Sequence, residues 1–406
     1  MALFLPTRRQ LAWQELEFGM FCHFGVNTFT NREWGDGSED PAIFQPAHLD
    51  CGQWARTARQ AGMRYAILTA KHHDGFCLWP TATTDHCVRR SPWRNGQGDV
   101  VREFVEACRA EGILPGLYCS PWDRNAACYP DPAAYSTFYL EQLRELCGNY
   151  GPLGEVWFDG AGSTGYSYDW PRIMAVVREL QPEAVVFNMG DPDIRWGGTE
   201  SGFGPPDLWT VVDPHRHEPP TGGPPTGIYQ PAEMDTTING AGWFWHPDSV
   251  GRIRSLTELV GVYYRSVGHG GNLLLNLAPN RDGLLDAAEV DRLGELAAEI
   301  RRRFGAPLGE AGPGVGAIEL TLAGATLVSR FVAMEDLTQG ETVQEWVLEA
   351  DMGRDDHGTL WHRLAAGQAL GHKRLGDFAP LVARRFRLSA ARARGQARFR
   401  SLRVFA

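Results

Sequence analysis

Short apolar segments alternate with amphipathic segments along the first 305 residues of the chain. Apolar runs of four to eight residues indicate buried strands, and apolar residues at spacings of three and four indicate helices. The predicted strands cover residues 18–25, 64–70, 114–120, 154–160, 184–189, 194–197, 230–238 and 271–279. The predicted helices cover residues 53–62, 100–112, 136–151, 171–182, 255–270 and 287–305.

This alternation of strand and helix predicts parallel strands joined by helical crossovers. Seven or eight such units over about 300 residues fit a (β/α)8 barrel of the TIM type, or a close variant of it. A doubly wound α/β sheet is the alternative. It would require a Gly-rich phosphate-binding turn after the first strand, and FCHFGVNTF, residues 21–29, is not such a turn.

The pattern changes after about residue 313, where apolar and polar residues alternate with a period of two. This alternation covers residues 318–334, 343–352, 383–393 and 397–406. It predicts a small antiparallel β domain, a sandwich, which we expect to pack against the barrel. The Gly-rich segment GEAGPGVG is interpreted as a linker. The predicted organisation is a catalytic barrel over residues 1–308, a linker over 309–316 and a β-sandwich domain over 317–406.

Composition excludes several classes of protein. The 406 residues are 43% hydrophobic and carry a net charge of −10, which is ordinary for a globular protein and argues against a nucleic-acid partner. No apolar run approaches the ~20 residues of a membrane helix, and the N-terminal segment lacks the order of a secretory signal. We therefore expect a cytoplasmic protein without a membrane partner. The eight cysteines lie between Cys22 and Cys147 without a CxxC pair, so buried reduced thiols are expected.

In a barrel of this type the active site lies at the carboxyl ends of the strands. The predicted strand ends carry His23, Lys71, His72, His73, Asp74, Tyr118, Cys119, Trp157, Asp159, Asn188, Arg195, Trp196, Glu200, Glu233, Asp235 and Asn276, with Trp34, Trp79, Trp122, Trp243 and Trp245 nearby. Sugars suit this set, because indole rings stack on their apolar face and polar side chains bond their hydroxyls. Glycoside cleavage needs two carboxyl groups. Asp159 fits the nucleophile, and Glu200, Glu233 or Asp235 fits the acid.

Two alternatives remain open at this point. Metal-assisted hydrolysis would use His23, His72, His73 and Asp159 as ligands, with His269 as a further one. The first strand, however, carries a single His rather than an H-x-H pair, and adjacent histidines of an extended segment point to opposite sides. A sugar-binding protein without catalysis would keep the aromatic residues and lose the carboxylates. Because Asp159, Glu200 and Glu233 are all present, the sequence favours an enzyme.

Five motifs together resemble the α-L-fucosidases of glycoside hydrolase family 29. They are FGMFCHFGVNTFTNREWGDG, YAILTAKHHDGFCLWP, GLYCSPWD, GEVWFDG and GNLLLNLAP, in that order, within residues 12–305. The resemblance implies a retaining enzyme without a metal or other cofactor, in which the aspartate of FDG, Asp159, is the nucleophile. It assigns the sugar pocket to His23, Glu33, Trp34, His72, His73 and Tyr118, with Trp157 and Trp243 as further contacts.

The acid/base residue carries over less directly. In the subgroup that RWGGTESG and YQPAEMDTTINGAGWFWHP resemble, it is a Glu some forty residues after the nucleophile. Here that is Glu200, 41 residues after Asp159, with Thr199 where the subgroup has Asn. Glu233 is the second candidate and could instead bind sugar or Arg195, which is expected to hold sugar hydroxyls.

The subgroup favours α-1,3/1,4-linked fucose in branched, Lewis-type glycans. The predicted partner is therefore a fucosylated oligosaccharide or glycoconjugate, from which terminal α-L-fucose is removed. A galactose subsite is expected in residues 202–226, with Asp213, His215 and His217 as polar contacts and Trp245 as a platform. The alternative is a general α-L-fucosidase without linkage preference. The sequence predicts no oligomeric state.

Overall fold

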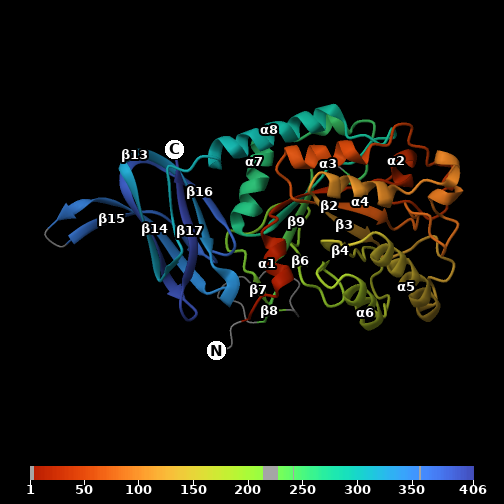
Figure 1. Cartoon of the computed structure of the whole chain (residues 1–406), viewed down its shortest axis with the longest axis horizontal. Helices are drawn as coiled ribbons and strands as arrows, with labels where there is room; N and C mark the ends of the chain where they lie inside the picture. The colour runs from red at the N-terminus through yellow and green to blue at the C-terminus, as the bar shows by residue number, and fades with distance from the viewer. Residues whose placement is uncertain (1–3, 214–226, 241, 356–357) are drawn as a thin grey trace.

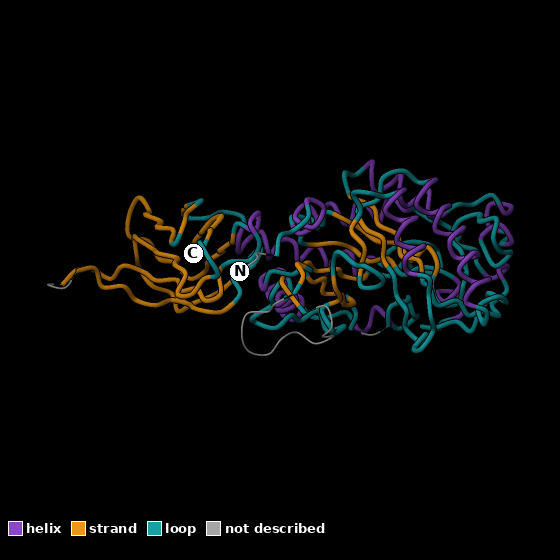
Figure 2. Tube along the Cα trace, turned by 90° about the horizontal axis from the view of Figure 1, so that it is seen from below, coloured by secondary structure: helices purple, strands orange, loops and turns teal. Residues whose placement is uncertain are grey.

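The computed structural model describes residues 4–213, 227–240, 242–355 and 358–406. The chain forms a barrel surrounded by helices and a separate β domain, which lie side by side along the longest axis of the molecule (Figures 1 and 2). The long helix α8 (Ala287–Phe304) runs from the barrel to the β domain.

The barrel is one sheet of eight strands in which every pair of neighbours is parallel. The strands are β1 (Phe18–Cys22), β2 (Tyr65–Lys71), β3 (Leu114–Cys119), β4 (Glu155–Trp157), β5 (Val185–Phe187), β6 (Arg195–Trp196), β9 (Ala232–Thr237) and β10 (Asn272–Asn276). Their order is β5-β4-β3-β2-β1-β10-β9-β6. A parallel bridge between Phe187 and Ile194 joins the two ends of the sheet. The predicted barrel is confirmed, and the doubly wound alternative is wrong.

Helices cover the outside of this barrel (Figure 1). They are α1 (Arg8–Gln14), α2 (Val26–Thr30), α3 (Cys51–Gln60), α4 (Val100–Ala110), α5 (Pro132–Asn149), α6 (Trp170–Leu180), α7 (Leu256–Arg265) and α8. Short 3-10 turns are Pro41–Ile43, Val88–Arg90, Trp93–Gly96, Ser249–Arg252, Val267–His269 and Leu337–Gln339. Residues 188–194 join β5 to β6 without a helix, so the barrel is a variant of the regular eightfold repeat. The hairpin of β7 (Val211–Val212) and β8 (Ile228–Tyr229) lies between β6 and β9.

Aspartates begin most of the crossover helices. Asp50, Asp99, Asp131 and Asp169 each accept a hydrogen bond from the first turn of α3, α4, α5 and α6. Asp131 is followed by a proline at the first helical position, which explains why α5 begins four residues before the predicted start. A capping box of Thr7 and Gln10 forms the helix α1, which the hydrophobic pattern did not predict.

The β domain contains β11 (Gly309–Ala311), β12 (Gly314–Val315), β13 (Ala317–Glu335), β14 (Val343–Asp355), β15 (Gly358–Gln368), β16 (Arg374–Ala393) and β17 (Arg398–Phe405). All of its strand pairs are antiparallel, as predicted. The long strands β13 and β16 contain register shifts, and the apolar side chains of β13, β14, β16 and β17 share one core. The predicted linker carries β11 and β12, because its backbone pairs with β17.

Polar and apolar contacts fix the β domain to the barrel. His372 and Lys373 both pair with Glu17, and Arg400 pairs with Glu15. Phe304 of α8 contacts Phe405 with a ring separation of 5.5 Å. The eight cysteines are unpaired, and all except Cys128 are buried. No helix within the described ranges combines the length and apolar character that crossing a bilayer requires.

We expect Glu17→Gln to destabilise the protein at neutral pH. Burial alone would raise the pKa of Glu17, but the hydrogen bond from His372 and the charge of Lys373 lower it from 4.5 to about 2. A lowered carboxyl pKa contributes stability that is present above pH 4.5 and is lost as the pH falls through about 2. Urea denaturation should give a cost of about 1–3 kcal/mol at pH 7, and half of that or less at pH 3.

Glu15→Gln is the matched control, because Glu15 and Arg400 are both about half exposed. Exposed ion pairs contribute roughly 0–1 kcal/mol, so this variant should cost less at pH 7. Equal costs for the two variants, or a cost of Glu17→Gln that does not change with pH, would contradict this account of the interface.

Candidate active site

A cavity of about 380 Å³ lies at the carboxyl ends of the barrel strands. Its lining residues are Phe21, His23, Trp34, His72, His73, Tyr118, Trp157, Asp159, Gly160, Ala161, Phe187, Asn188, Met189, Trp196, Glu200, Asp235 and Trp243. Nine of the twelve residues that the sequence assigned to the site are in this set. Glu33, Arg195 and Glu233 are not.

Asp159 follows β4 and extends into the cavity. Its Oδ1 accepts a hydrogen bond from the backbone N–H of Ala161 at 2.9 Å, and its Oδ2 accepts one from the Tyr118 hydroxyl at 3.2 Å. Burial raises the pKa of the Asp159 carboxyl above its usual value, although these two hydrogen bonds oppose the shift. A carboxylate held in this way is more basic than one in water and has a fixed direction, as a nucleophile requires.

His23 presents a hydrogen-bond acceptor to the cavity. Asn276 uses its side-chain N–H to bond the carbonyl of Trp243 at 2.8 Å, so its Oδ1 is free to accept from His23 Nδ1, also at 2.8 Å. The proton of the neutral ring is then on Nδ1, and Nε2 carries a lone pair. Burial lowers the pKa of His23 to about 3, so the ring is neutral at physiological pH.

His73 is oriented by the same principle. Its Nδ1 lies 2.7 Å from Ser120 Oγ, and that hydroxyl donates to the carbonyl of Trp122 at 2.8 Å. The serine therefore accepts from His73 Nδ1, which leaves Nε2 as an acceptor 3.6 Å from Asp159 Oδ2. Burial lowers the pKa of His73 to about 3 and that of His72 well below 6.5. Neutral imidazoles beside a carboxylate can bind hydroxyl groups without neutralising the carboxylate.

Aromatic rings form much of the cavity lining. Trp157 stacks on Phe187 with ring centroids 3.9 Å apart and on Tyr118 with centroids 5.2 Å apart. Trp243 packs against His23 with a separation of 5.1 Å, and Trp34, which is 48% exposed, stands at the opening beside His73. These indoles provide the apolar surface that the C–H face of a sugar requires.

Glu33 supports the cavity from outside its lining. Its carboxylate accepts a hydrogen bond from the backbone N–H of Trp243 at 2.6 Å and contacts the ring of His246. Trp245, the predicted platform for galactose, donates to Asp286 at 2.8 Å and is not among the lining residues. The structure thus gives Glu33 a contact with the loop that carries Trp243.

Glu233, predicted to contact sugar or to serve as the second acid candidate, lies below the cavity. It is fully buried and accepts hydrogen bonds from Tyr65 Oη at 2.6 Å and from Trp157 Nε1 at 2.9 Å. The side chain is the second of β9, and Asp235, two residues later on the same face of the strand, reaches the cavity instead. Glu233 therefore fixes Trp157, which lines the cavity, and is not itself a lining residue.

Arg195, predicted to bind sugar hydroxyls, also lies outside the cavity lining. Its Nη2 donates to the carbonyl of Trp209 at 2.9 Å. Burial lowers its pKa to about 10, and Glu341 of the β domain opposes this shift. The contacts with Trp209 and Glu341 thus place the guanidinium at the domain interface.

Glu200 lies in the loop that follows β6 and lines the cavity, as Trp196 and Asp235 also do. Trp196 donates to Asp235 Oδ1 at 2.7 Å, and burial raises the pKa of Asp235 well above its usual value. Thr199 bonds the hydroxyl of Ser201 at 3.2 Å and accepts a hydrogen bond from the Ser201 backbone N–H, also at 3.2 Å. The cavity thus contains three carboxyl groups, of which Glu200 is the exposed one.

Several lining residues were missed or left without a role by the sequence analysis. Trp196 and Asn188 are in the strand-end set, but no function was assigned to them. Asp235 was named there only as one of three candidates for the acid. Phe21, Phe187 and Met189 were taken as strand interior. Their neighbours in sequence were informative: Phe187 and Met189 flank Asn188 at the end of β5, and Phe21 precedes His23 by two residues on the inward face of β1.

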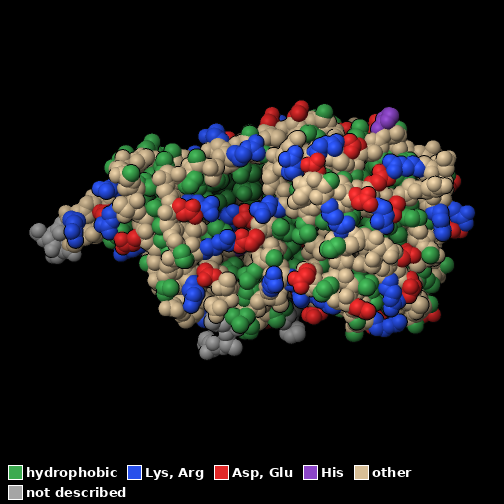
Figure 3. Space-filling view, viewed as in Figure 1, with side chains coloured by type: hydrophobic (Ala, Val, Ile, Leu, Met, Phe, Trp, Pro, Cys, Tyr) green, Lys and Arg blue, Asp and Glu red, His purple; other side chains and the backbone are tan. Residues whose placement is uncertain are grey.

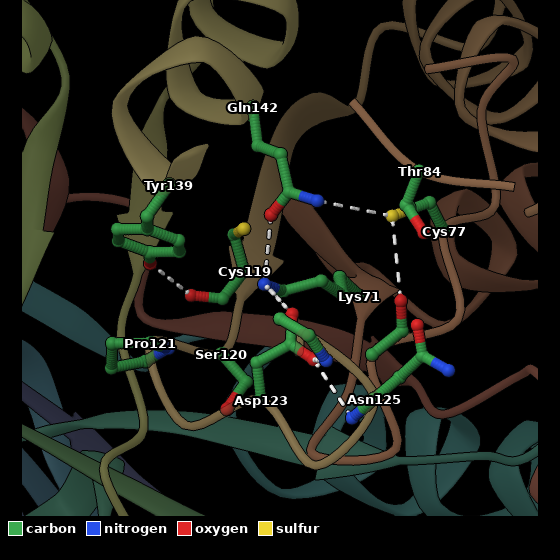
Figure 4. A network of polar contacts seen from close by, with 12 residues as sticks. Lys71, Cys77, Thr84, Cys119, Ser120, Pro121, Asp123, Asn125, Tyr139 and Gln142 are labelled. Carbon is green, nitrogen blue, oxygen red and sulfur yellow. Dashed lines mark hydrogen bonds and ion pairs between the residues drawn. The ribbon is translucent and has the colours of Figure 1, made fainter. Parts of the chain in front are cut away.

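A buried ion pair fixes the segment that carries the two histidines (Figure 4). Lys71 at the end of β2 is fully buried, and its Nζ donates to Asp123 Oδ2 at 2.9 Å and to Gln142 Oε1 at 2.8 Å. Asp123 Oδ1 also accepts from the backbone N–H groups of Asn125 and Ala126. The loop after β3 is thereby attached to the residue directly before His72.

The distribution of surface charge and the grouping of side chains that could bind a metal ion also bear on the chemistry of the site. Basic and acidic side chains are interspersed over the face of the molecule in Figure 3. Within the described ranges, no three His, Cys, Asp or Glu side chains are grouped as ligands of one metal ion would be. The chemistry that the cavity offers is that of carboxylates, neutral imidazoles and aromatic rings.

Comparisons with known proteins agree on one family. The family described as Alpha-L-fucosidase matches residues 39–302. The Alpha-L-fucosidase 1 of Arabidopsis thaliana is 42% identical over 304 residues, which are 72% of this chain and 60% of that protein. The chain thus spans about 60% of the length of this curated relative.

Solved structures match over the whole chain. A glycoside hydrolase 29 family member from an unknown rumen bacterium superposes with a TM-score of 0.88 at 36% identity, covering 100% of this chain and 77% of that one. A Ruminococcus gnavus GH29 fucosidase in complex with fucose gives a TM-score of 0.88 at 26% identity, covering 100% and 95%. Together with the barrel and its carboxylate-containing cavity, these matches establish that the chain belongs to the α-L-fucosidase family.

Proposed function

We propose that this protein is a retaining exo-α-L-fucosidase that removes terminal α-L-fucose from oligosaccharides or glycoconjugates. The observation that carries the proposal is the joint presence of Asp159 and Glu200 in one cavity whose walls are indole rings and neutral histidines. The Ruminococcus gnavus relative, which is a fucosidase in complex with fucose, supports the choice of sugar.

In the first step Asp159 attacks the anomeric carbon and forms a fucosyl ester. Glu200 gives its proton to the departing glycosidic oxygen, so the leaving group departs as an alcohol. In the second step the Glu200 carboxylate takes a proton from water. The resulting hydroxide attacks the anomeric carbon, and the Asp159 carboxylate is released. Two inversions give net retention. The acceptor nitrogens of His23 and His73 bind fucose hydroxyls throughout.

The first prediction concerns the nucleophile. Asp159→Asn keeps the shape of the side chain and removes the charge that attacks. Turnover of an aryl fucoside should fall by roughly 10³-fold or more, which corresponds to about 4 kcal/mol of transition-state stabilisation. Fucose binding, measured by calorimetry, should change little. Azide should restore activity only when residue 159 is shortened to Gly or Ala. Near-wild-type turnover of the Asn variant would refute the assignment.

The second prediction concerns the acid. Glu200→Gln should lose about 10²–10⁴-fold on fucosides with poor leaving groups and much less on activated aryl fucosides, which need little protonation. Azide should accelerate Glu200→Ala by attacking the fucosyl ester. Asp235→Asn is the matched control, because Asp235 also lines the cavity and interacts electrostatically with Glu200. If Asp235→Asn shows this dependence on the leaving group and Glu200→Gln does not, Asp235 is the acid.

We further propose a preference for α-1,3/1,4-linked fucose in branched, Lewis-type glycans, with a general α-L-fucosidase as the alternative. The support is the similarity of residues 195–202 and 229–247 to the subgroup with this preference. A galactose subsite that acts in the transition state would accelerate branched substrates only. Of its predicted contacts, His215 and His217 lie outside the described residues.

The linkage prediction is tested by kcat/KM on a Lewis-type trisaccharide, the same glycan without galactose, a 1,2-linked fucoside and an aryl fucoside. The branched trisaccharide should exceed the galactose-free glycan by at least ~10-fold, the equivalent of ~1.4 kcal/mol. One or two good hydrogen bonds to galactose supply that energy. Equal values with and without galactose would exclude the subsite and favour the general fucosidase.

A further inference from the structure

The loop of residues 197–210, which carries Glu200, is held at its two ends by different parts of the molecule. At its beginning the barrel holds it, because the N–H of Gly197 donates to the carbonyl of Glu233 at 2.8 Å. Further along, the N–H of Gly204 donates to the carbonyl of Arg265 at 2.7 Å, and His269 Nδ1 bonds the carbonyl of Gly204 at 2.8 Å.

The end of the loop is held by the β domain. Oε2 of Glu341 accepts hydrogen bonds from the backbone N–H groups of Thr210 at 3.0 Å and Val211 at 3.2 Å. Nη1 of Arg374 donates to the carbonyl of Pro206 at 2.7 Å. Both side chains are more than nine-tenths buried. Because buried backbone groups need partners, removing either side chain leaves the loop with unpaired groups.

Three buried ionisable side chains lie together at these contacts. Arg195 donates to the carbonyl of Trp209 from the barrel side, and Glu341 interacts electrostatically with both Arg195 and Arg374. Burial lowers the pKa of each arginine to about 10, so both remain charged at neutral pH. Burial raises the pKa of Glu341 to about 7, and the charges of Arg195 and Arg374 oppose this rise. Each of the two guanidinium groups bonds a carbonyl of the same loop.

The β domain also packs against the barrel segment that bonds Gly204. His269 belongs to the 3-10 turn Val267–His269, and Gly268 in that turn faces Leu375 of β16. A Cβ on Gly268 would come within 3.0 Å of the Leu375 side chain, so the turn fits closely against the domain. Both the middle and the end of the loop therefore depend on the β domain.

Glu200 depends on this support because its own side chain is exposed. Among the described residues, no hydrogen bond holds its carboxylate, so the position of the carboxylate follows from the backbone of the loop. A proton donor must stand within hydrogen-bond reach of the glycosidic oxygen, and a displacement of about 1 Å at such a group can cost about 10²-fold in rate.

We propose that Glu341 and Arg374 are positioning residues for acid–base catalysis, and that the β domain completes the active site by holding the loop of Glu200. This inference rests on the proposed function, in which Glu200 is the acid. It gives the β domain a catalytic task without requiring it to contact the glycan.

The test compares Glu341→Ala and Arg374→Met with Leu348→Ala in the full-length protein. Leu348 is fully buried in the core of the β domain, so its truncation weakens that domain without removing a contact to the loop. For each variant, kcat/KM is measured on aryl fucosides whose phenols range from acidic to weakly acidic. Backbone hydrogen exchange of residues 197–211 is measured in parallel.

We expect kcat/KM of Glu341→Ala and Arg374→Met to fall at least ~10-fold more on the weakly acidic phenol than on the acidic one. Hydrogen exchange of residues 197–211 should be faster in Glu341→Ala and Arg374→Met than in Leu348→Ala. In Leu348→Ala, kcat/KM should fall equally on both fucosides. The proposal is overturned if kcat/KM of Glu341→Ala and Arg374→Met falls equally on the fucosides of both phenols. It is also overturned if kcat/KM of Leu348→Ala falls more on the fucoside of the weakly acidic phenol. If Glu341→Ala does not fold, Arg374→Met decides.

The outcome also separates this inference from the proposed function. If the wild-type protein cleaves none of these fucosides, or Glu200→Ala shows no dependence on the leaving group, the proposed function fails. Hydrogen exchange then decides alone whether the β domain holds the loop. If Glu200→Ala shows that dependence but the two β-domain variants do not, only the positioning role fails.

Discussion

The buried carboxyl of Glu233 is the contact on which the cavity depends. It joins β9 to β2 through Tyr65 and to β4 through Trp157, across the centre of the barrel. Glu155 lies beside it, and burial raises the pKa of Glu155 well above its usual value and that of Glu233 to about 7. The charge of Glu233 adds to the rise in the pKa of Glu155, so Glu155 is the carboxyl of this pair that holds a proton more firmly.

A series of contacts leads from Glu233 to the carboxylate of Asp159 in the cavity. Trp157, fixed by Glu233, stacks on Tyr118, and Tyr118 donates to the Asp159 carboxylate. Below the network, Gly19 leaves room for the Tyr65 ring, since a Cβ at Gly19 would lie 2.5 Å from it. A single buried carboxyl thus fixes the relative positions of strands that are far apart in the sequence, because the Glu233 side chain of β9 bonds side chains of β2 and β4.

The sequence predicted the barrel and most of the cavity because both depend on regular features. Parallel strands bring their carboxyl ends together, so His23, His73 and Asp159 had to meet. Glu233 and Arg195 lie outside the cavity lining for a related reason. A strand pattern tells which residues face inward, but not at which height along the barrel axis each side chain ends, and both residues stand near the start of their strands.

The pattern of apolar and polar residues also did not predict the contacts between the two domains. Gly-rich residues 309–316 have the composition of a linker, and only the pairing with β17 gives them strand structure. Glu341 and Arg374 have no motif, and their importance follows from the backbone groups they bond in a loop more than a hundred residues earlier. An ionisable residue that packing buries at a domain interface cannot be told from a surface residue by its neighbours in sequence.

The most direct test of the account is the configuration of the first product. Proton NMR during hydrolysis of an aryl α-L-fucoside distinguishes the two anomers of fucose before mutarotation mixes them. Attack by Asp159 followed by attack of water requires that α-L-fucose appears first. If β-L-fucose appears first, water attacks the substrate directly, and Asp159 is not the nucleophile of a covalent intermediate.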